Sequence, residues 1–271
     1  MSAVHAIVLG IVQGLTEFLP ISSTAHLRIV PAFLGWPDPG AAFTAVVQLG
    51  TMAAVLLYFR ADLWRIARTW FASLRQPELR GELDARMGWY IGLGTVPIAI
   101  FGFIFRDQIE SGGRNLYLIG SALIVLGLVL LYADRVARRD RALEDINRTD
   151  AIVTGFAQAC ALVPGVSRSG ATITGGLFRG FDRASAARYS FLLSVPAVVL
   201  SGLFEARKIG GAHSAGVVPT ILATLLAFVV GYASIAWMLR YLVRHSMTVF
   251  VVYRVALGAL VLVLVASGAI S

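Results

Sequence analysis

The chain has 271 residues, of which 58% are hydrophobic and only 14% are charged. A soluble domain cannot cover that much apolar surface, so the composition predicts a protein embedded in a membrane. The formal net charge of +8 does not indicate nucleic acid binding, because the arginines stand in short loops between apolar runs. The single cysteine, Cys160, excludes an intrachain disulfide and a cysteine-based metal site.

Apolar runs long enough to cross a bilayer alternate with apolar stretches that are interrupted. The interrupted stretches are 3–40, which contains Pro20 and Pro31, and 151–185, which contains Pro164 and several glycines. Such stretches seldom form straight spans, but broken or re-entrant helices tolerate them where the freed backbone lines a cavity. The six predicted spans are about 42–59, 87–105, 116–133, 188–204, 216–239 and 248–269.

The order of segments repeats: a broken segment and three spans, then a broken segment and three spans. The two motifs are offset by about 145 residues, so residues 1–150 and 151–271 are predicted to be two repeats. If each broken segment enters and leaves by one face, each half crosses the membrane three times and the second half is inverted. We therefore predict an all-α integral membrane fold, an inverted repeat of six transmembrane helices and two re-entrant helix hairpins. Chance similarity between two turns rich in Pro and Ser is the alternative.

The arginines gather in loops that are separated by two crossings, and such loops lie on the same side of the membrane. The positive-inside rule makes these loops cytoplasmic, and the first broken segment then begins at the outer face. The acidic residues of these loops are expected to solvate them. The basic residues on the predicted cytoplasmic side are Arg60, Arg65, Arg68, Arg75, Arg80, Arg86, Arg135, Arg138, Arg139, Arg141, Arg148, Arg179, Arg183, Arg188, Arg240 and Arg244, and the acidic ones are Asp62, Glu78, Glu82, Asp84 and those in 140–150.

The first motif, QGLTEFLPISSTAH, covers residues 13–26. Gln13 and Glu17 are four residues apart, so a helix stacks them on one face. Pro20 ends that helix, and the hydroxyl residues 22–24 suit the N-cap of the next one. Two serines precede His26 by three and four residues, so at least one hydroxyl can face the imidazole. A capped kink with a self-satisfied histidine is the structural alternative.

The second motif, ALVPGVSRSGAT, covers residues 161–172 and reads as a glycine-flanked turn that opens another helix. Such turns expose backbone N–H groups, and the helix dipole adds positive potential. Arg168 adds a rigid fork of donors that suits phosphate oxygens. The nucleotide-binding signature GxxxxGK[ST] is absent from the sequence. The motif therefore predicts an anion-binding turn, with an arginine that extends to the membrane interface as the alternative.

Together the two motifs predict a site for a phosphate-bearing ligand whose hydrocarbon part lies in lipid. Glu17 would hold a hard divalent cation or orient an attacking water. His26 suits proton transfer, and Arg168 would stabilise charge on the transferred phosphoryl group. The predicted substrate-binding residues are Ser22, Thr24, Gly165, Ser167, Ser169, Gly170 and Thr172.

Both motifs closely resemble the signature segments of the undecaprenyl-diphosphate phosphatase family, integral-membrane enzymes linked to bacitracin resistance. The similarity extends over the chain and includes AFTAVVQLGT at 42–51 and FLLSVPAVVLSGLF at 191–204. The resemblance implies hydrolysis of undecaprenyl diphosphate to the monophosphate carrier for peptidoglycan synthesis. It also implies a plasma-membrane location, an active site at the outer face, a divalent cation (Mg²⁺ or Ca²⁺) and a homodimer.

Carried over by position, Glu17 is a motif acid, His26 the motif histidine and Arg168 the arginine of the SRSG turn. Ser23 is a candidate nucleophile or phosphate ligand, and water is an equally open attacking group. Glu17 and Gln13 are the predicted metal ligands. Many family members have a glutamate at the position of Gln13, so this chain has one negative charge fewer there.

Two other functions fit parts of the pattern. A polyprenyl-phosphate flippase or transporter is one, because inverted repeats with broken helices are typical of secondary carriers. A type-2 phosphatidic acid phosphatase is the other, but that pattern expects a histidine shortly after its arginine. Position 174, six residues after Arg168, is a threonine, and we set that function aside.

Overall fold

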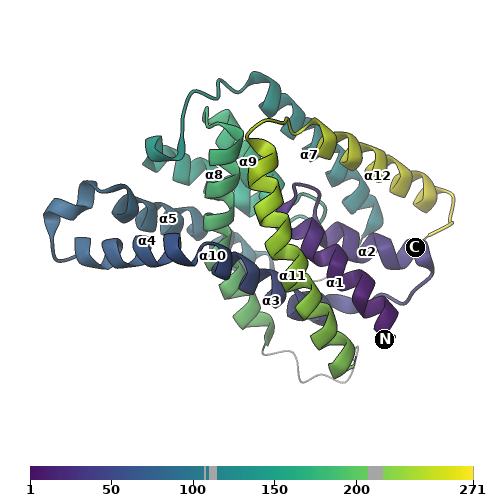
Figure 1. Cartoon of the computed structure of the whole chain (residues 1–271). Helices are drawn as coiled ribbons and strands as arrows, with labels where there is room; N and C mark the ends of the chain where they lie inside the picture. The colour runs from purple at the N-terminus through teal and green to yellow at the C-terminus, as the bar shows by residue number, and fades with distance from the viewer. Residues whose placement is uncertain (107, 110–114, 207–215, 271) are drawn as a thin grey trace.

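The computed structural model describes residues 1–106, 108–109, 115–206 and 216–270, and these form an all-helical structure without β-strands (Figure 1). Short 3₁₀ turns lie at Pro77–Gly81 and Leu143–Asp145. The α-helices in these ranges are α1 (Ala3–Phe18), α2 (Ser23–Leu34), α3 (Gly40–Tyr58), α4 (Arg60–Ser73), α5 (Leu83–Ile104), α7 (Leu116–Val136), α8 (Arg148–Cys160), α9 (Arg168–Phe178), α10 (Arg183–Ala206), α11 (Val217–Leu242) and α12 (Thr248–Ala266).

Within the described residues, four helices are long and apolar enough to cross a membrane: α5, α7, α11 and α12. A fifth span is possible if α3 and α4, which meet at an angle of 71°, are counted as one broken element. The predicted run 188–204 falls inside α10, which is not among these helices. The prediction of an all-α protein with several membrane helices is therefore confirmed.

The first interrupted stretch is broken where the sequence predicts it. Helix α1 ends at Phe18, two residues before Pro20, and α2 begins at Ser23. Ser22 is the N-cap of α2 and has an unusual positive φ of 73°, while its hydroxyl accepts a hydrogen bond from the Ala25 amide at 3.4 Å. Pro31, in contrast, lies inside α2 and does not end it.

The second interrupted stretch repeats this local structure. Helix α8 ends at Cys160 and α9 begins at Arg168, with Ser167 as the N-cap. Ser167 has a φ of 72°, and its hydroxyl accepts from the Gly170 amide at 3.2 Å. A positive φ is rare in residues with a side chain and costs energy. Two N-cap serines with this backbone conformation at matching positions therefore indicate that both stretches break in the same way.

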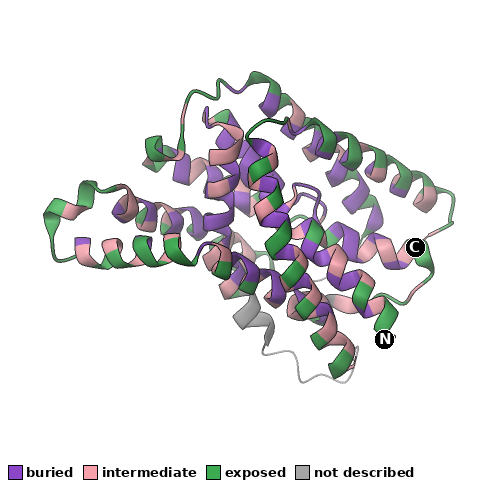
Figure 2. Cartoon of the chain, viewed as in Figure 1, coloured by how far each residue is buried: buried purple, intermediate pink, exposed green. Residues whose placement is uncertain are grey.

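The first helix of each interrupted stretch packs against a helix from the other half of the chain. Helix α1 packs on α11 and α8 packs on α5, while α7 and α12 lie side by side (Figure 1). Close approach needs glycine: a Cβ on Gly10 would lie 2.5 Å from the carbonyl oxygen of Ala223, and one on Gly155 would lie 2.8 Å from the Cα of Gly94. Figure 2 shows the buried residues gathered around α8 and α9, with exposed residues along α4 and the outward side of α12.

One expectation for the arginine-rich loops is wrong. Residues 60–73, within a stretch predicted as a basic loop, form helix α4. The acidic residues do not simply solvate the surface: Asp62 forms ion pairs with Arg65 and Arg188, at 3.1 and 2.6 Å. Asp150 has no exposed surface and binds arginines of two neighbouring segments. Arginines that are far apart in sequence converge on these carboxylates, which local sequence patterns do not reveal.

Candidate functional site

A cavity of about 640 Å³ lies where the two helix breaks meet. One part of its wall is polar and the other is apolar, so it suits a ligand with a charged head and a hydrocarbon tail. The polar residues are Gln13, Glu17, Ser22, Ser23, Thr24, Thr44, Gln48, Thr95, Arg106, Ser167 and Arg168, and the apolar ones include Ile98, Ala99, Phe103, Ile109, Leu162, Ala197 and Leu200.

Glu17 joins the two motifs in this cavity. Its Oε1 forms an ion pair with the Arg168 guanidinium, which is 151 positions away in sequence. Its Oε2 accepts hydrogen bonds from the Ser23 hydroxyl at 2.6 Å and from the Gln13 amide at 3.0 Å. The Glu17 side chain is only 7% exposed, and these donors replace the water that a buried carboxylate loses.

The two breaks explain why these side chains meet. Gln13 and Glu17 lie one turn apart near the end of α1. Ser23 is the first residue of α2 and Arg168 the first residue of α9, so each break delivers a helix N-terminus together with a polar side chain. Helix N-termini present unpaired N–H groups and the positive end of the dipole. The site can therefore bind an anion through two N-termini and one guanidinium.

Five of the predicted site residues are not among those that line the cavity, and several of them hold the breaks in place. The Ser169 hydroxyl donates to the Leu19 carbonyl at 3.0 Å, which ties α9 to the first break. Thr172 donates to the Arg168 carbonyl at 2.8 Å. These residues are Gly165, Ser169, Gly170, Thr172 and His26.

His26 faces a remote helix rather than the Glu17 carboxylate. Its Nδ1 lies 2.7 Å from the carbonyl oxygen of Ser22, and its Nε2 lies 2.6 Å from the Tyr253 hydroxyl on α12. The expectation that a serine hydroxyl faces the imidazole is wrong, because the Ser22 hydroxyl caps α2 and the Ser23 hydroxyl binds Glu17. The role of His26 in proton transfer stays a prediction.

Several polar residues of the cavity were not predicted from the sequence. Thr44 and Gln48 on α3 line it. Thr51, one turn further along α3, lies 3.4 Å from the Gln13 amide nitrogen. Polar residues at helical spacing inside an apolar run were the signal that could have found them. Arg106, just beyond α5, adds a second guanidinium to the wall.

The site can contribute oxygen ligands to a cation but cannot enclose one with carboxylates. In the described ranges there is no group of three or more His, Cys, Asp or Glu side chains that could hold a metal. The buried Oε1 of Gln13, beside Glu17, has no hydrogen-bond partner among these residues. A magnesium-type ion needs one or two carboxylates and takes its remaining ligands from phosphate and water. The donors present fit that mode of binding.

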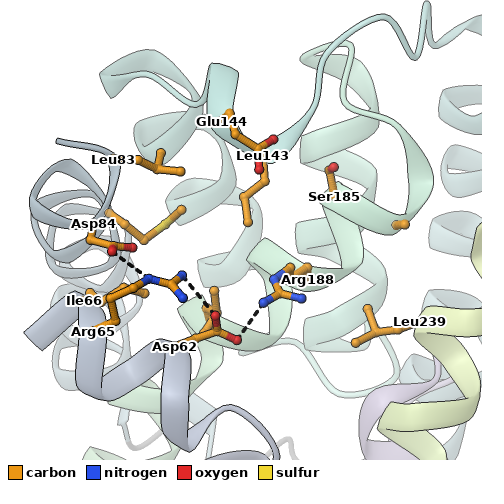
Figure 3. A pocket seen from close by; sticks show the side chains of 13 residues that line it. Asp62, Arg65, Ile66, Leu83, Asp84, Leu143, Glu144, Ser185, Arg188 and Leu239 are labelled. Atoms are coloured by element: carbon orange, nitrogen blue, oxygen red, sulfur yellow. Dashed lines mark hydrogen bonds and ion pairs between the residues drawn. The ribbon is translucent and has the colours of Figure 1, made fainter. Parts of the chain in front are cut away.

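A second hollow, of about 380 Å³, lies between α4, α5 and α10 (Figure 3). Arg65 binds Asp62 and Asp84, and Arg188 binds the other oxygen of Asp62. These side chains lie on α4, α5 and α10 and not at the two helix breaks, unlike those of the first cavity. Because both arginines of this hollow are paired with carboxylates, it offers an anionic ligand less than the cavity at the breaks does.

The fold and the site together define a helical membrane protein with a partly polar cavity at two broken helices. The chain belongs to the family described as Bacitracin resistance protein BacA, whose sequence profile matches residues 6–260.

Its relatives share nearly the full length of the chain. An "Undecaprenyl-diphosphatase" of Nocardioides sp. is 59% identical over 268 residues, which cover 98% of each chain. Proteins of the same name from Thermobifida fusca and Myxococcus xanthus are 55% and 52% identical and cover 100% of this chain, matching 93% and 92% of their own lengths.

Proposed function

We propose that this protein is an undecaprenyl-diphosphate phosphatase, which hydrolyses the lipid diphosphate to undecaprenyl phosphate and inorganic phosphate. The observation that carries the proposal is the Glu17 carboxylate, which accepts a hydrogen bond from Ser23 and forms an ion pair with Arg168. It lies in a cavity whose wall has a polar part and an apolar part. The names of the relatives support the phosphatase rather than lipid translocation. The product is the lipid carrier that peptidoglycan synthesis needs.

The geometry suits attack on the terminal phosphorus. A nucleophilic oxygen forms a bond to that phosphorus, the bond to the bridging oxygen breaks, and undecaprenyl phosphate leaves. Glu17 accepts the proton of the nucleophile, for which its hydrogen bond with Ser23 at 2.6 Å is the right length. Arg168 and the two helix N-termini stabilise the charge on the transferred group.

The nucleophile is either the Ser23 hydroxyl or a water in the same position. Serine attack forms a phosphoseryl enzyme, which a water then hydrolyses, whereas direct water attack releases phosphate in one step. Rapid acid quenching with a substrate labelled in its terminal phosphate separates the two. If serine attacks, the quenched wild type carries the label and Ser23→Ala carries none. If water attacks, the wild type carries no label although it releases phosphate at its normal rate.

A divalent cation, Mg²⁺ or Ca²⁺, is part of this proposal. Glu17 and the Oε1 of Gln13 would hold it, and it would neutralise charge on the diphosphate. Gln13→Glu adds a carboxylate beside Glu17 and should tighten cation binding about tenfold while activity changes only a few-fold. Calorimetric titration of the purified protein with Mg²⁺ measures this. Complete inactivation with unchanged binding would contradict the placement of Gln13 beside the ion.

We also propose that residues 1–150 and 151–271 form an inverted repeat of six spans and two re-entrant hairpins. The matching N-caps Ser22 and Ser167 support it, as does the exchanged packing of α1 on α11 and α8 on α5. The arginine-rich loops then lie in the cytoplasm and the cavity opens to the outer face of the plasma membrane. In a Cys160→Ala background, a cysteine at Trp36 should react with an impermeant maleimide in intact cells, and one at Leu79 should not.

Phosphate release tests the function directly. The protein is purified in detergent, alone and as Glu17→Ala and Arg168→Ala, and is supplied with undecaprenyl diphosphate. The wild type should release phosphate and both variants should lose at least about 100-fold in rate. Arg240→Ala, on the far end of α11 with a hydrogen bond to its own helix, is the matched control and should keep full activity. If the wild-type protein instead moves lipid across a vesicle membrane and releases no phosphate, it is a carrier and the proposed function is wrong. Size and mass of the same preparation test the homodimer that the family resemblance implies.

A further inference from the structure

Arg254 lies in the middle of α12 and has no exposed surface. Within the described ranges it pairs with no carboxylate, and its guanidinium donates to backbone carbonyls instead. A charge at such depth in a membrane is costly unless its donors are satisfied. Its carbonyl partners are those of Pro20, Ala122, Leu123, Gly165 and Val166.

These carbonyls belong to three separate segments. Pro20, at 3.0 Å, lies in the first helix break. Gly165 and Val166, at 3.1 and 3.0 Å, lie in the second break, and the remaining two are on α7. Carbonyls in a break have left the helix that would satisfy them, and lipid offers no donor in exchange. A single guanidinium therefore donates hydrogen bonds to carbonyls of both breaks and links the two breaks to each other.

We infer that Arg254 is a positioning residue that sets the distance between the two halves of the active site. Each break continues directly into an N-cap serine with positive φ, Ser22 or Ser167, and then into Ser23 or Arg168. Such backbone strain persists only where the surroundings hold it. Arg254 thus acts through the breaks on Ser23 and Arg168, two of the three side chains that bind Glu17. The inference rests on the proposed phosphatase function.

The guanidinium is suited to this role in a way that an ammonium is not. Arginine has five donors on a planar fork, which can reach several carbonyls at once. Lysine has three donors on one nitrogen and cannot bridge two breaks and a helix. The neighbouring Tyr253 adds a contact from α12 to the start of α2 through His26, so α12 holds the first break at two points.

The test compares Arg254→Lys with the control Arg183→Lys. The control also replaces a largely buried arginine, but that arginine forms an ion pair with Asp134 and neither residue lines the cavity. Activity is expressed per folded molecule, and the folded fraction is taken from the monodisperse peak in detergent. In Arg254→Lys, kcat should fall about 100-fold, because displacement of reacting groups by about 1 Å costs that much. KM should stay within a few-fold, since Arg168 is intact. Arg183→Lys should lose stability but keep both constants.

A pair of glycine variants keeps the inference testable if Arg254→Lys does not fold. A Cβ on Gly127 would lie 3.3 Å from the Cβ of Arg254 and 3.6 Å from its Nε, whereas a Cβ on Gly92 meets nothing within 4 Å. Both substitutions to alanine raise helix propensity. Gly127→Ala should therefore lower kcat several-fold without loss of stability, and Gly92→Ala should change neither.

The outcomes separate the two proposals. If the wild type releases phosphate and Arg254→Lys retains its kcat per folded molecule, the positioning role is overturned. Equal kinetics of the two glycine variants would overturn it as well. A wild type that releases no phosphate contradicts the proposed function instead.

Discussion

The cavity at the breaks and the hollow beside α4 both contain arginine–carboxylate pairs, yet the two pairs differ in what surrounds them, and we propose only the first as the active site. In the hollow, Asp62 uses both oxygens for arginines, and Arg65 binds Asp84 at 2.6 Å as well. In the cavity, Glu17 binds a hydroxyl, an amide and a guanidinium that stand at helix ends. Charge alone therefore does not define the site; broken helices that deliver N–H groups and a hydroxyl do.

Substitutions in the two regions should therefore affect different properties of the protein. Substitutions in the cavity should act on turnover, because its groups are held ready for a ligand. Substitutions in the paired clusters should act on stability, because their groups satisfy one another. The largest contrast lies between two arginines, Arg168 and Arg188, which differ in surroundings and not in chemistry.

Arg168→Lys should lower kcat/KM by about 100- to 1,000-fold, since one ammonium cannot replace a planar fork on a phosphoryl group. Arg188→Lys, in the hollow, should stay within about two-fold of the wild type, because a partly exposed ion pair contributes little. Phosphate release at a series of substrate concentrations measures both. Comparable losses in the two variants would remove the distinction between the cavity and the hollow.

Asp150 provides a second contrast, through pH. It lies at the first turn of α8, outside the candidate membrane spans. Burial raises the pKa of its carboxyl, but hydrogen bonds from Arg141 at 2.6 Å and Arg179 at 2.7 Å outweigh burial and hold the pKa below its ordinary value. A depressed pKa in the folded state adds stability above about pH 4, and this is lost as pH falls through the folded pKa.

Asp150→Asn should therefore destabilise the protein by about 2 kcal/mol at pH 7, with turnover per folded molecule unchanged. The difference in unfolding temperature from the wild type should shrink as the pH falls below about 4. Thermal unfolding in detergent from pH 7 to 3 measures it. A difference that does not vary with pH would mean that the carboxylate charge is not what stabilises the start of α8.

His26 lies between the two kinds of region, since it supports a break but does not line the cavity. His26→Ala should lower kcat about tenfold, with less change in KM, because the Ser22 carbonyl and the Tyr253 hydroxyl lose their shared partner. Tyr253→Phe should have a smaller effect, and the double variant should be no worse than His26→Ala alone. Fully additive losses would show that the two residues act separately.

Local rules predicted the parts of the site that depend on neighbouring residues. The break after Phe18 follows from the proline at position 20, and an N-cap among the hydroxyl residues 22–24 was predicted and is Ser22. The turn that opens α9 was predicted as well, but its N-cap, Ser167, was not. The proximity of Glu17 and Arg168 follows from a different rule, because charged groups buried in a membrane need a partner, a polar cavity or a charged ligand. The sequence predicted that they share one site, and the direct ion pair between them was not predicted.

The parts that could not be predicted depend on how remote helices are rotated. Whether Arg254 faces lipid, a carboxylate or two helix breaks depends on the packing of α12 against α7, which no short motif encodes. The Tyr253 hydroxyl reaches His26 across 227 positions for the same reason. Helix α4 was missed because its arginines resemble a charged loop, while the apolar side that buries Ile66 is short.

The smallest expected effect is the coupling between Asp62 and Arg188. Their atoms lie 2.6 Å apart, but the Arg188 side chain is 41% exposed and Asp62 keeps a second partner in Arg65. Solvent screening then limits the pair to about 0.5 kcal/mol. A double-mutant cycle of Asp62→Asn and Arg188→Gln, followed by denaturant or thermal unfolding, should give a coupling of that size with unchanged phosphate release. A coupling above about 2 kcal/mol, or a loss of turnover, would mean that the hollow beside α4 is linked to the cavity, and the division of the molecule into a reactive and a satisfied region would fail.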